Sequence, residues 1–155
     1  MRVKTLYIPV IIQPEEATAC YEYLAQNIRW EEGIRSRFGF TRFGKALLPG
    51  DNPVVDNLVN VVIDELKKTN EICNLRYIYL NWYQNGTHYT PSHSHPKMKQ
   101  FVISLGATRT LVIGTKEYKL ENGDVILFGS STHYVPKEPN VKEGRISIAT
   151  FMSCD

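Results

Sequence analysis

The chain has 155 residues, of which 43% are hydrophobic and 22% charged, which is enough to bury the core of one domain of ordinary size. Eighteen basic and 16 acidic residues leave a net charge of +2, so charge alone does not indicate a strong polyanion binder. No apolar segment approaches the ~20 residues of a membrane span. Cys20, Cys73 and Cys154 show no CxxC spacing, which favours reduced thiols. We expect a single soluble, intracellular domain over residues 1–155.

The first half of the chain predicts a short strand at residues 5–12 and then two helices. Gln13-Pro14-Glu15-Glu16 has the proline and the acidic residues typical of a helix start, and apolar residues three to four positions apart follow it. A second start at Asp51-Asn52-Pro53 precedes an apolar face that should lie against a sheet, made by Val54, Leu58, Val61, Val62 and Leu66.

Between the two predicted helices, residues 30–50 lack a helical period. Basic and aromatic side chains are interleaved there: Arg35, Arg37, Phe38, Phe40, Arg42, Phe43 and Lys45. Such a pattern is consistent with a nucleic-acid-binding face, and equally with aromatic side chains that pack inward beneath solvated cations.

The second half of the chain predicts a sheet protein. Short β-branched or aromatic runs at residues 77–83, 101–105, 110–113, 125–128 and 146–151 are divided by glycine-containing turns, which indicates a sandwich or barrel of antiparallel strands. With two helices before it, this pattern predicts an α+β fold, in which a double-stranded β-helix (jelly roll) is backed by two N-terminal helices.

Three histidines of this half form a candidate metal site. His93 and His95 are two positions apart, and on an extended segment that spacing turns both side chains to the same face. His133, on a later strand, offers a third ligand, and three ligands leave open positions on an octahedral ion. Arg145 is available to the same pocket as an anion clamp. A His-x-His pair alone also occurs as a surface or turn feature, so the prediction of a small non-haem iron oxygenase depends on all these residues together.

Six segments, in this order, resemble one known family. They are Asn-Trp-Tyr-Gln-Asn-Gly at 81–86, His-Ser-His at 93–95, Ile-Ser-Leu-Gly-Ala-Thr-Arg at 103–109, Leu-Glu-Asn-Gly-Asp-Val-Ile-Leu-Phe at 120–128, His-Tyr-Val-Pro-Lys at 133–137 and Arg-Ile-Ser-Ile-Ala-Thr-Phe at 145–151. Together they resemble the AlkB family of iron(II)- and 2-oxoglutarate-dependent dioxygenases. The upstream part of the chain is similar to the front of that family more loosely.

This resemblance implies a site for Fe(II) and one for the cosubstrate. The family holds iron with a His-x-Asp pair and a distant histidine, which fall on His93, position 95 and His133. It holds 2-oxoglutarate with an Asn-x-Tyr pair and an arginine that forks the distal carboxylate, which fall on Asn81, Tyr83 and Arg145.

The chain departs from the family at three positions. The family's asparagine two residues after the arginine falls on Ser147, which we expect at the same cosubstrate site, and a second family arginine falls on Met152. At position 95, histidine replaces aspartate, so three neutral imidazoles leave Fe(II) fully dicationic and also suit Zn, Ni or Cu. Three hypotheses follow: a working three-histidine iron site, a site in which His95 is not a ligand, or a fold that only binds.

The resemblance also implies a substrate class, an N-alkylated nucleic-acid base flipped from the stack and packed against His93. Arg42 and Phe43 lie where relatives carry their base-recognition lid, so we expect them to contact substrate and nucleic acid to be the partner. Two alternatives remain: a non-catalytic or metal-binding module on this fold, and a three-histidine dioxygenase that does not use 2-oxoglutarate. Residues that clamp a distal carboxylate argue against the second.

Overall fold

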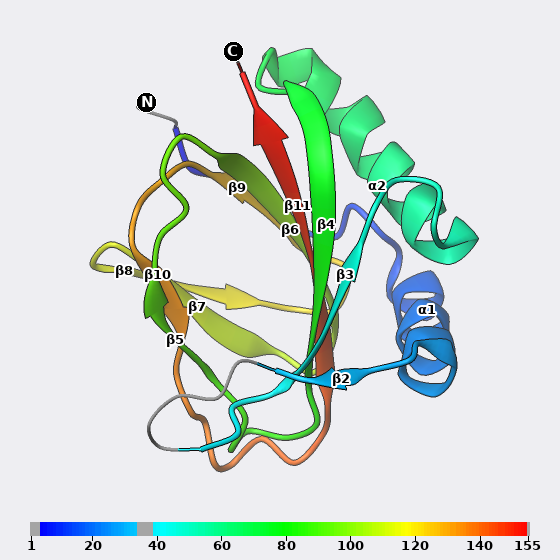
Figure 1. Cartoon of the computed structure of the whole chain (residues 1–155), viewed down its shortest axis with the longest axis vertical. Coiled ribbons are helices and arrows are strands. Elements are labelled where there is room, and N and C mark those ends of the chain that lie inside the picture. The colour runs from blue at the N-terminus through cyan, green and yellow to red at the C-terminus, as the bar shows by residue number, and fades with distance from the viewer. Residues whose placement is uncertain (1–3, 34–38, 155) are drawn as a thin grey trace.

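The computed structural model describes residues 4–33 and 39–154, and it builds them into two facing antiparallel sheets with two helices outside the larger one (Figure 1). The helical elements are α1 (Pro14–Asn27), α2 (Pro53–Leu66) and the short 3₁₀ helix η1 (Lys67–Thr69). The strands are β1 (Leu6–Ile8), β2 (Glu31–Glu32), β3 (Phe43–Leu47), β4 (Asn74–Tyr83), β5 (Thr90–His93), β6 (Lys99–Gly106), β7 (Arg109–Ile113), β8 (Lys116–Leu120), β9 (Val125–Phe128), β10 (His133–Val135) and β11 (Arg145–Ser153).

The order of strands within the sheets is that of a jelly roll. The larger sheet runs β1-β9-β6-β11-β4-β3-β2 and the smaller one β5-β10-β7-β8, so the chain passes back and forth between the sheets. Both helices lie on the face of the larger sheet that points away from β5, β7 and β10 (Figure 1). The predicted fold class, a double-stranded β-helix backed by two N-terminal helices, is confirmed.

Both helix starts follow from local chemistry. Pro14 begins α1 and acidic residues fill its first turn, while the Asn52 side chain caps α2 by accepting from the backbone N–H of Val54 (3.0 Å) and Val55 (3.1 Å). The buried face of α2 is rotated from the predicted one. Val61 is 37% exposed, and the buried residues are Val55, Leu58, Val59, Val62 and Leu66. No helix in the described ranges is long and apolar enough to cross a membrane.

Alternation along the central strands separates two cores. On β11, Ile146, Ile148 and Met152 face the helices. The residues that alternate with them, Arg145, Ser147, Ala149 and Phe151, line a cavity between the two sheets. The residue of β11 that reaches the histidine end of this cavity is therefore Phe151, whereas Met152, on which the second family arginine falls, is buried on the helix side.

Two further expectations are corrected. The N-terminal strand is shorter than residues 5–12, because β1 ends at Ile8 and Val10 adopts a φ of 51°, its N–H donating to the Asp124 carboxylate (2.9 Å). The expectation of three reduced thiols is wrong for Cys73 and Cys154, which form a disulfide with their Cα atoms 5.0 Å apart, while Cys20 is free. Antiparallel pairing places the start of β4 beside the end of β11, and this brings the two cysteines together.

Candidate metal centre

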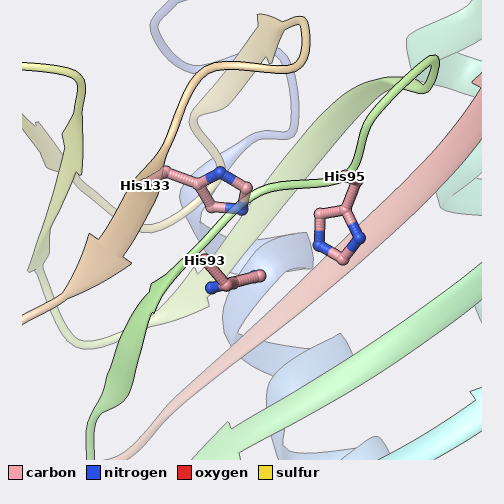
Figure 2. A group of neighbouring side chains, drawn as sticks. All are labelled: His93, His95 and His133. Carbon is pink, nitrogen blue, oxygen red and sulfur yellow. The ribbon is translucent and has the colours of Figure 1, made fainter.

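The three histidines predicted as ligands lie together, with their rings turned toward one another (Figure 2). His93 ends β5 and pairs directly with His133 at the start of β10, while His95 lies two residues beyond β5. One ring nitrogen of each lies within 4.8 Å of the other two. Metal–nitrogen bonds of about 2.1 Å would draw these nitrogens closer together.

Hydrogen bonds of two of these rings select the nitrogen that faces a metal. Nδ1 of His93 lies 2.9 Å from the carbonyl oxygen of Pro91, and Nδ1 of His133 lies 2.9 Å from that of Ser131. A carbonyl only accepts, so Nδ1 carries the proton and donates in both rings. Nε2 of each ring is left with its lone pair free for a metal.

Burial keeps two of the rings in the neutral form that binds metal. It lowers the pKa of His133 to about 4, with the neighbouring His93 and His95 acting in the same direction, and burial also lowers the pKa of His95. The His93–His95–His133 cluster contains no carboxylate in the part of the chain that the structure describes. A set of three imidazoles with open positions is suited to Fe(II), and equally to Zn, Ni or Cu.

The histidines open into a cavity of about 360 Å³ between the sheets, a volume typical of small-ligand sites. Its floor is the inner face of the larger sheet, and strand pairing arranges that floor in rows. Arg145 pairs with Tyr83 at one end of the floor. Phe151 lies at the other end, with its ring 4.7 Å from that of His95. The cavity thus has a polar end and an aromatic end, and the histidines lie over the aromatic end.

Arg145 is the main feature of the polar end. Its side chain is 1% exposed, its Nε donates to Ser104 Oγ (2.8 Å), and its guanidinium carbon lies 5.4 Å from the centre of the Tyr83 ring. Burial lowers its pKa to about 10, so it remains a cation at neutral pH. Among the described residues no carboxylate forms an ion pair with Arg145. Since an unpaired buried charge is unfavourable, this end of the cavity is suited to an anion.

The predicted cosubstrate residues Asn81 and Ser147 are joined beside this arginine. Asn81 Nδ2 donates to Ser147 Oγ (3.3 Å), and Asn81 Oδ1 accepts from Arg42 Nε (2.8 Å). Tyr83 lines the same cavity, and its hydroxyl lies 2.6 Å from Thr90 Oγ1. The structure therefore gathers all four predicted cosubstrate residues around the polar end.

The two predicted substrate-binding residues separate. Arg42 is buried in the cavity wall, whereas Phe43 packs against Phe40, Trp82 and His88 away from the cavity. Adjacent residues of an extended segment point to opposite sides, which explains why Arg42 lines the cavity and Phe43 does not. Their contact with substrate stays a prediction. Three further basic and aromatic residues of that segment, Arg35, Arg37 and Phe38, lie outside the described residues.

Four residues of the site were missed in the sequence. Gln100 lines the cavity from β6, and Ser104 on the same strand accepts a hydrogen bond from Arg145. Thr90 is hydrogen-bonded to Tyr83, and Arg109 joins the loops after β4 and β10. The available signal in the sequence was the pair of polar residues Gln100 and Ser104, which lie four positions apart in the otherwise apolar run 100–106. A polar side chain at an inward position of a buried strand needs a partner, and such a partner is often a ligand.

No family model and no curated protein sequence matches this chain. Solved structures do. OsALKBH1 superposes with a TM-score of 0.70 at 16% identity, covering 99% of each chain. A prolyl-4-hydroxylase of Pseudomonas putida gives 0.64 at 16% identity, over 97% of this chain and 92% of that one. A predicted oxalate decarboxylase of Thermotoga maritima gives 0.56 at 13% identity, over 82% and 94%. At these identities, the similarity shows the fold alone, a jelly roll shared with these proteins and with a 2OG-Fe(II) oxygenase family member of Burkholderia pseudomallei.

Proposed function

We propose that this protein is an Fe(II)- and 2-oxoglutarate-dependent dioxygenase with a three-histidine metal site. One observation carries the proposal: a single cavity joins a cluster of three histidines to a buried arginine that forms no ion pair among the described residues. A metal site alone suits many enzymes. The pairing of that site with a cation for a distal carboxylate matches the length and charge of 2-oxoglutarate.

The residues of the chain have distinct tasks in this proposal. Arg145 binds the distal carboxylate, with Ser104 fixing the guanidinium and Tyr83 beside it. Asn81 and Ser147 line the cosubstrate site between that end and the metal. Bound Fe(II) supplies oxygen activation coupled to the decarboxylation of 2-oxoglutarate to succinate. The aromatic walls exclude bulk water from the reacting groups.

We also propose an N-alkylated nucleic-acid base as the substrate. The resemblance to the AlkB family and the aromatic side chains of the cavity, among them Tyr79, Phe128 and Tyr134, support a flat substrate. Hydroxylation of an N-methyl group produces a carbinol, which releases formaldehyde and leaves the unmethylated base. Formaldehyde release from a methylated oligonucleotide, with the unmethylated oligonucleotide as control, tests this substrate class.

The experiment that tests the function is an anaerobic titration of Fe(II)-loaded protein with 2-oxoglutarate, followed through the visible charge-transfer band, before oxygen is admitted and succinate is measured. We expect both the band and succinate. Arg145→Ala should weaken 2-oxoglutarate binding by about 1.5–3 kcal/mol, because it removes a charge-assisted fork. Arg76→Ala, which removes a cation hydrogen-bonded to Ser153 outside the cavity, should leave the affinity unchanged.

Three outcomes would count against the proposal. Metal binding without a band or succinate would favour a module that binds metal on an oxygenase fold, the alternative that the imidazole at position 95 supports. Oxidation that needs no 2-oxoglutarate would favour a three-histidine dioxygenase of another kind. Equal 2-oxoglutarate affinity in wild type and Arg145→Ala would show that the clamp lies elsewhere.

A further inference from the structure

Gln100 is a buried polar residue of the cavity that neither the metal cluster nor the polar end uses. It lies on β6, lines the cavity and is 3% exposed. Its Nε2 has no hydrogen-bond partner among the described residues. A buried donor left without a partner is unfavourable and rare, so an amide N–H in the wall of a ligand cavity indicates an acceptor on the ligand.

Strand pairing places Gln100 at the histidine end of the cavity. It is directly opposite Phe128 of β9 on one side and Phe151 of β11 on the other. The ring of Phe128 lies 4.8 Å from that of His133, and the ring of Phe151 lies 4.7 Å from that of His95. Both neighbours of Gln100 in the sheet therefore contact the histidine cluster, and Gln100 lies between them.

The aromatic residues of this row supply no positive charge for a ligand. On β11 the inward residue is Phe151, and Met152 is buried on the helix side. Tyr77 completes the row, but its ring is stacked on Phe151 (4.6 Å, 16° between planes). A dicarboxylate such as 2-oxoglutarate, held at its far carboxylate by Arg145, places its second carboxylate at the histidine end, where a polar side chain of this row can donate to it.

Resting on the proposed function, we propose that Gln100 is a cosubstrate-binding residue that donates from Nε2 to the carboxylate next to the keto group of the 2-oxo acid. The amide takes the place of a cation there. A neutral donor is suited to this position, because a cation would be repelled by an ion whose two charges no carboxylate ligand offsets. Gln100 and Arg145 then bind the two ends of one molecule.

The test compares two ligands and two variants. Fe(II)-loaded protein is titrated without oxygen with 2-oxoglutarate and with 2-oxobutyrate, which keeps the 2-oxo acid end but lacks the distal carboxylate. Gln100→Leu should weaken both ligands about tenfold, the typical effect of losing a hydrogen bond to a charged group. Arg145→Ala should weaken 2-oxoglutarate only. If Gln100→Leu does not fold, Gln100→Met is used in its place, because methionine keeps the length of the glutamine side chain.

Thr150→Val is the matched control. Thr150 Oγ1 is the other buried side-chain atom without a hydrogen-bond partner in the described ranges, and it lies one residue from Phe151 but opposite Ile78 and Phe101, which belong to the helix-side core. Its removal should leave both affinities unchanged. Unchanged 2-oxoglutarate affinity in Gln100→Leu would overturn the assignment of Gln100 alone. Absence of 2-oxoglutarate binding in the wild-type protein would overturn the proposed function, and this assignment with it.

Discussion

Two neighbouring side chains at the histidine end of the cavity, His95 and Phe151, are both without negative or positive charge when His95 is in its metal-binding state. Their rings meet edge to face at 4.7 Å, the imidazole in the place of a carboxylate and the phenyl ring at the inward end of β11. Without an anionic ligand, a bound Fe(II) keeps both of its charges, and a cation at position 151 would be repelled by it. An apolar ring there is consistent with a neutral ligand at position 95.

Restoring a carboxylate tests the role of position 95. His95→Asp should bind Fe(II) more tightly, on the order of tenfold, because an anionic donor offsets one charge of the ion. The affinity is measured by competition with a chelator. His88→Asp makes the same change at a histidine that packs against Phe40 and Phe43 outside the cluster, and it should leave Fe(II) affinity unaltered. Weaker binding in His95→Asp would mean that the pocket is built for three imidazoles.

Among the elements, β7 connects the loops at the rim of the cavity. Arg109, at its start, is 1% exposed and pairs with Glu138 (3.1 Å). It also donates to three carbonyl groups, those of Asn85 (3.2 Å), His88 (2.7 Å) and Pro136 (2.9 Å). One side chain therefore binds the loop after β4 to the loop after β10. Its guanidinium carbon lies 5.1 Å from the ring of Tyr83, so this support extends to the polar end of the cavity.

Loss of this arginine should destabilise the fold. Arg109→Met leaves the Glu138 carboxylate and three carbonyl groups without their donor, and the expected loss in the free energy of unfolding is about 3–5 kcal/mol. Denaturant unfolding of the metal-free protein measures it. The surface variant Arg76→Met should change stability by less than about 0.5 kcal/mol. In the double variant with Glu138→Gln, the two losses should be less than additive, since the two residues share one interaction; additive losses would contradict the pairing.

Across the whole molecule, the Cys73–Cys154 disulfide joins the segment before β4 to the end of β11, across a sequence separation of 81 residues. These two strands are neighbours at the centre of the larger sheet. A cross-link over so long a loop restricts the unfolded chain strongly, and it does so without changing the cavity. The ion pair of Lys99 with Glu71 (2.7 Å) joins the same end of the sheet to the segment before β4.

Reduction of the disulfide should lower the free energy of unfolding by roughly 3–5 kcal/mol. Denaturant unfolding with and without a thiol reductant measures the difference. Cys73→Ala with Cys154→Ala should unfold like the reduced wild-type protein and should not respond to reductant. Cys20→Ser, which removes the free thiol, should keep the full response. A wild-type protein whose stability does not change on reduction would contradict the assigned stabilisation.

Local patterns were sufficient for much of the fold. The proline and acidic residues at the start of α1, the start of α2 at Asn52, and the short β-branched or aromatic runs that became β4, β6, β9 and β11 each depend on residues near one another in the chain. The candidate ligands were found for the same reason, because two of them lie two positions apart on one extended segment. The fine rotation of α2 was not predicted, since its stripe is decided by the sheet beneath it.

The sequence by itself determined the jelly-roll class, the two helices and the identity of the three histidines, because short-range periodicity and spacing encode them. Only the tertiary structure decided which inward side chains meet: Phe151 rather than Met152 beside His95, Arg42 without Phe43 in the cavity, and Gln100 with its unpartnered amide. It also paired Cys73 with Cys154. These contacts join strands far apart in the chain, and register between such strands is set by packing of the whole sheet.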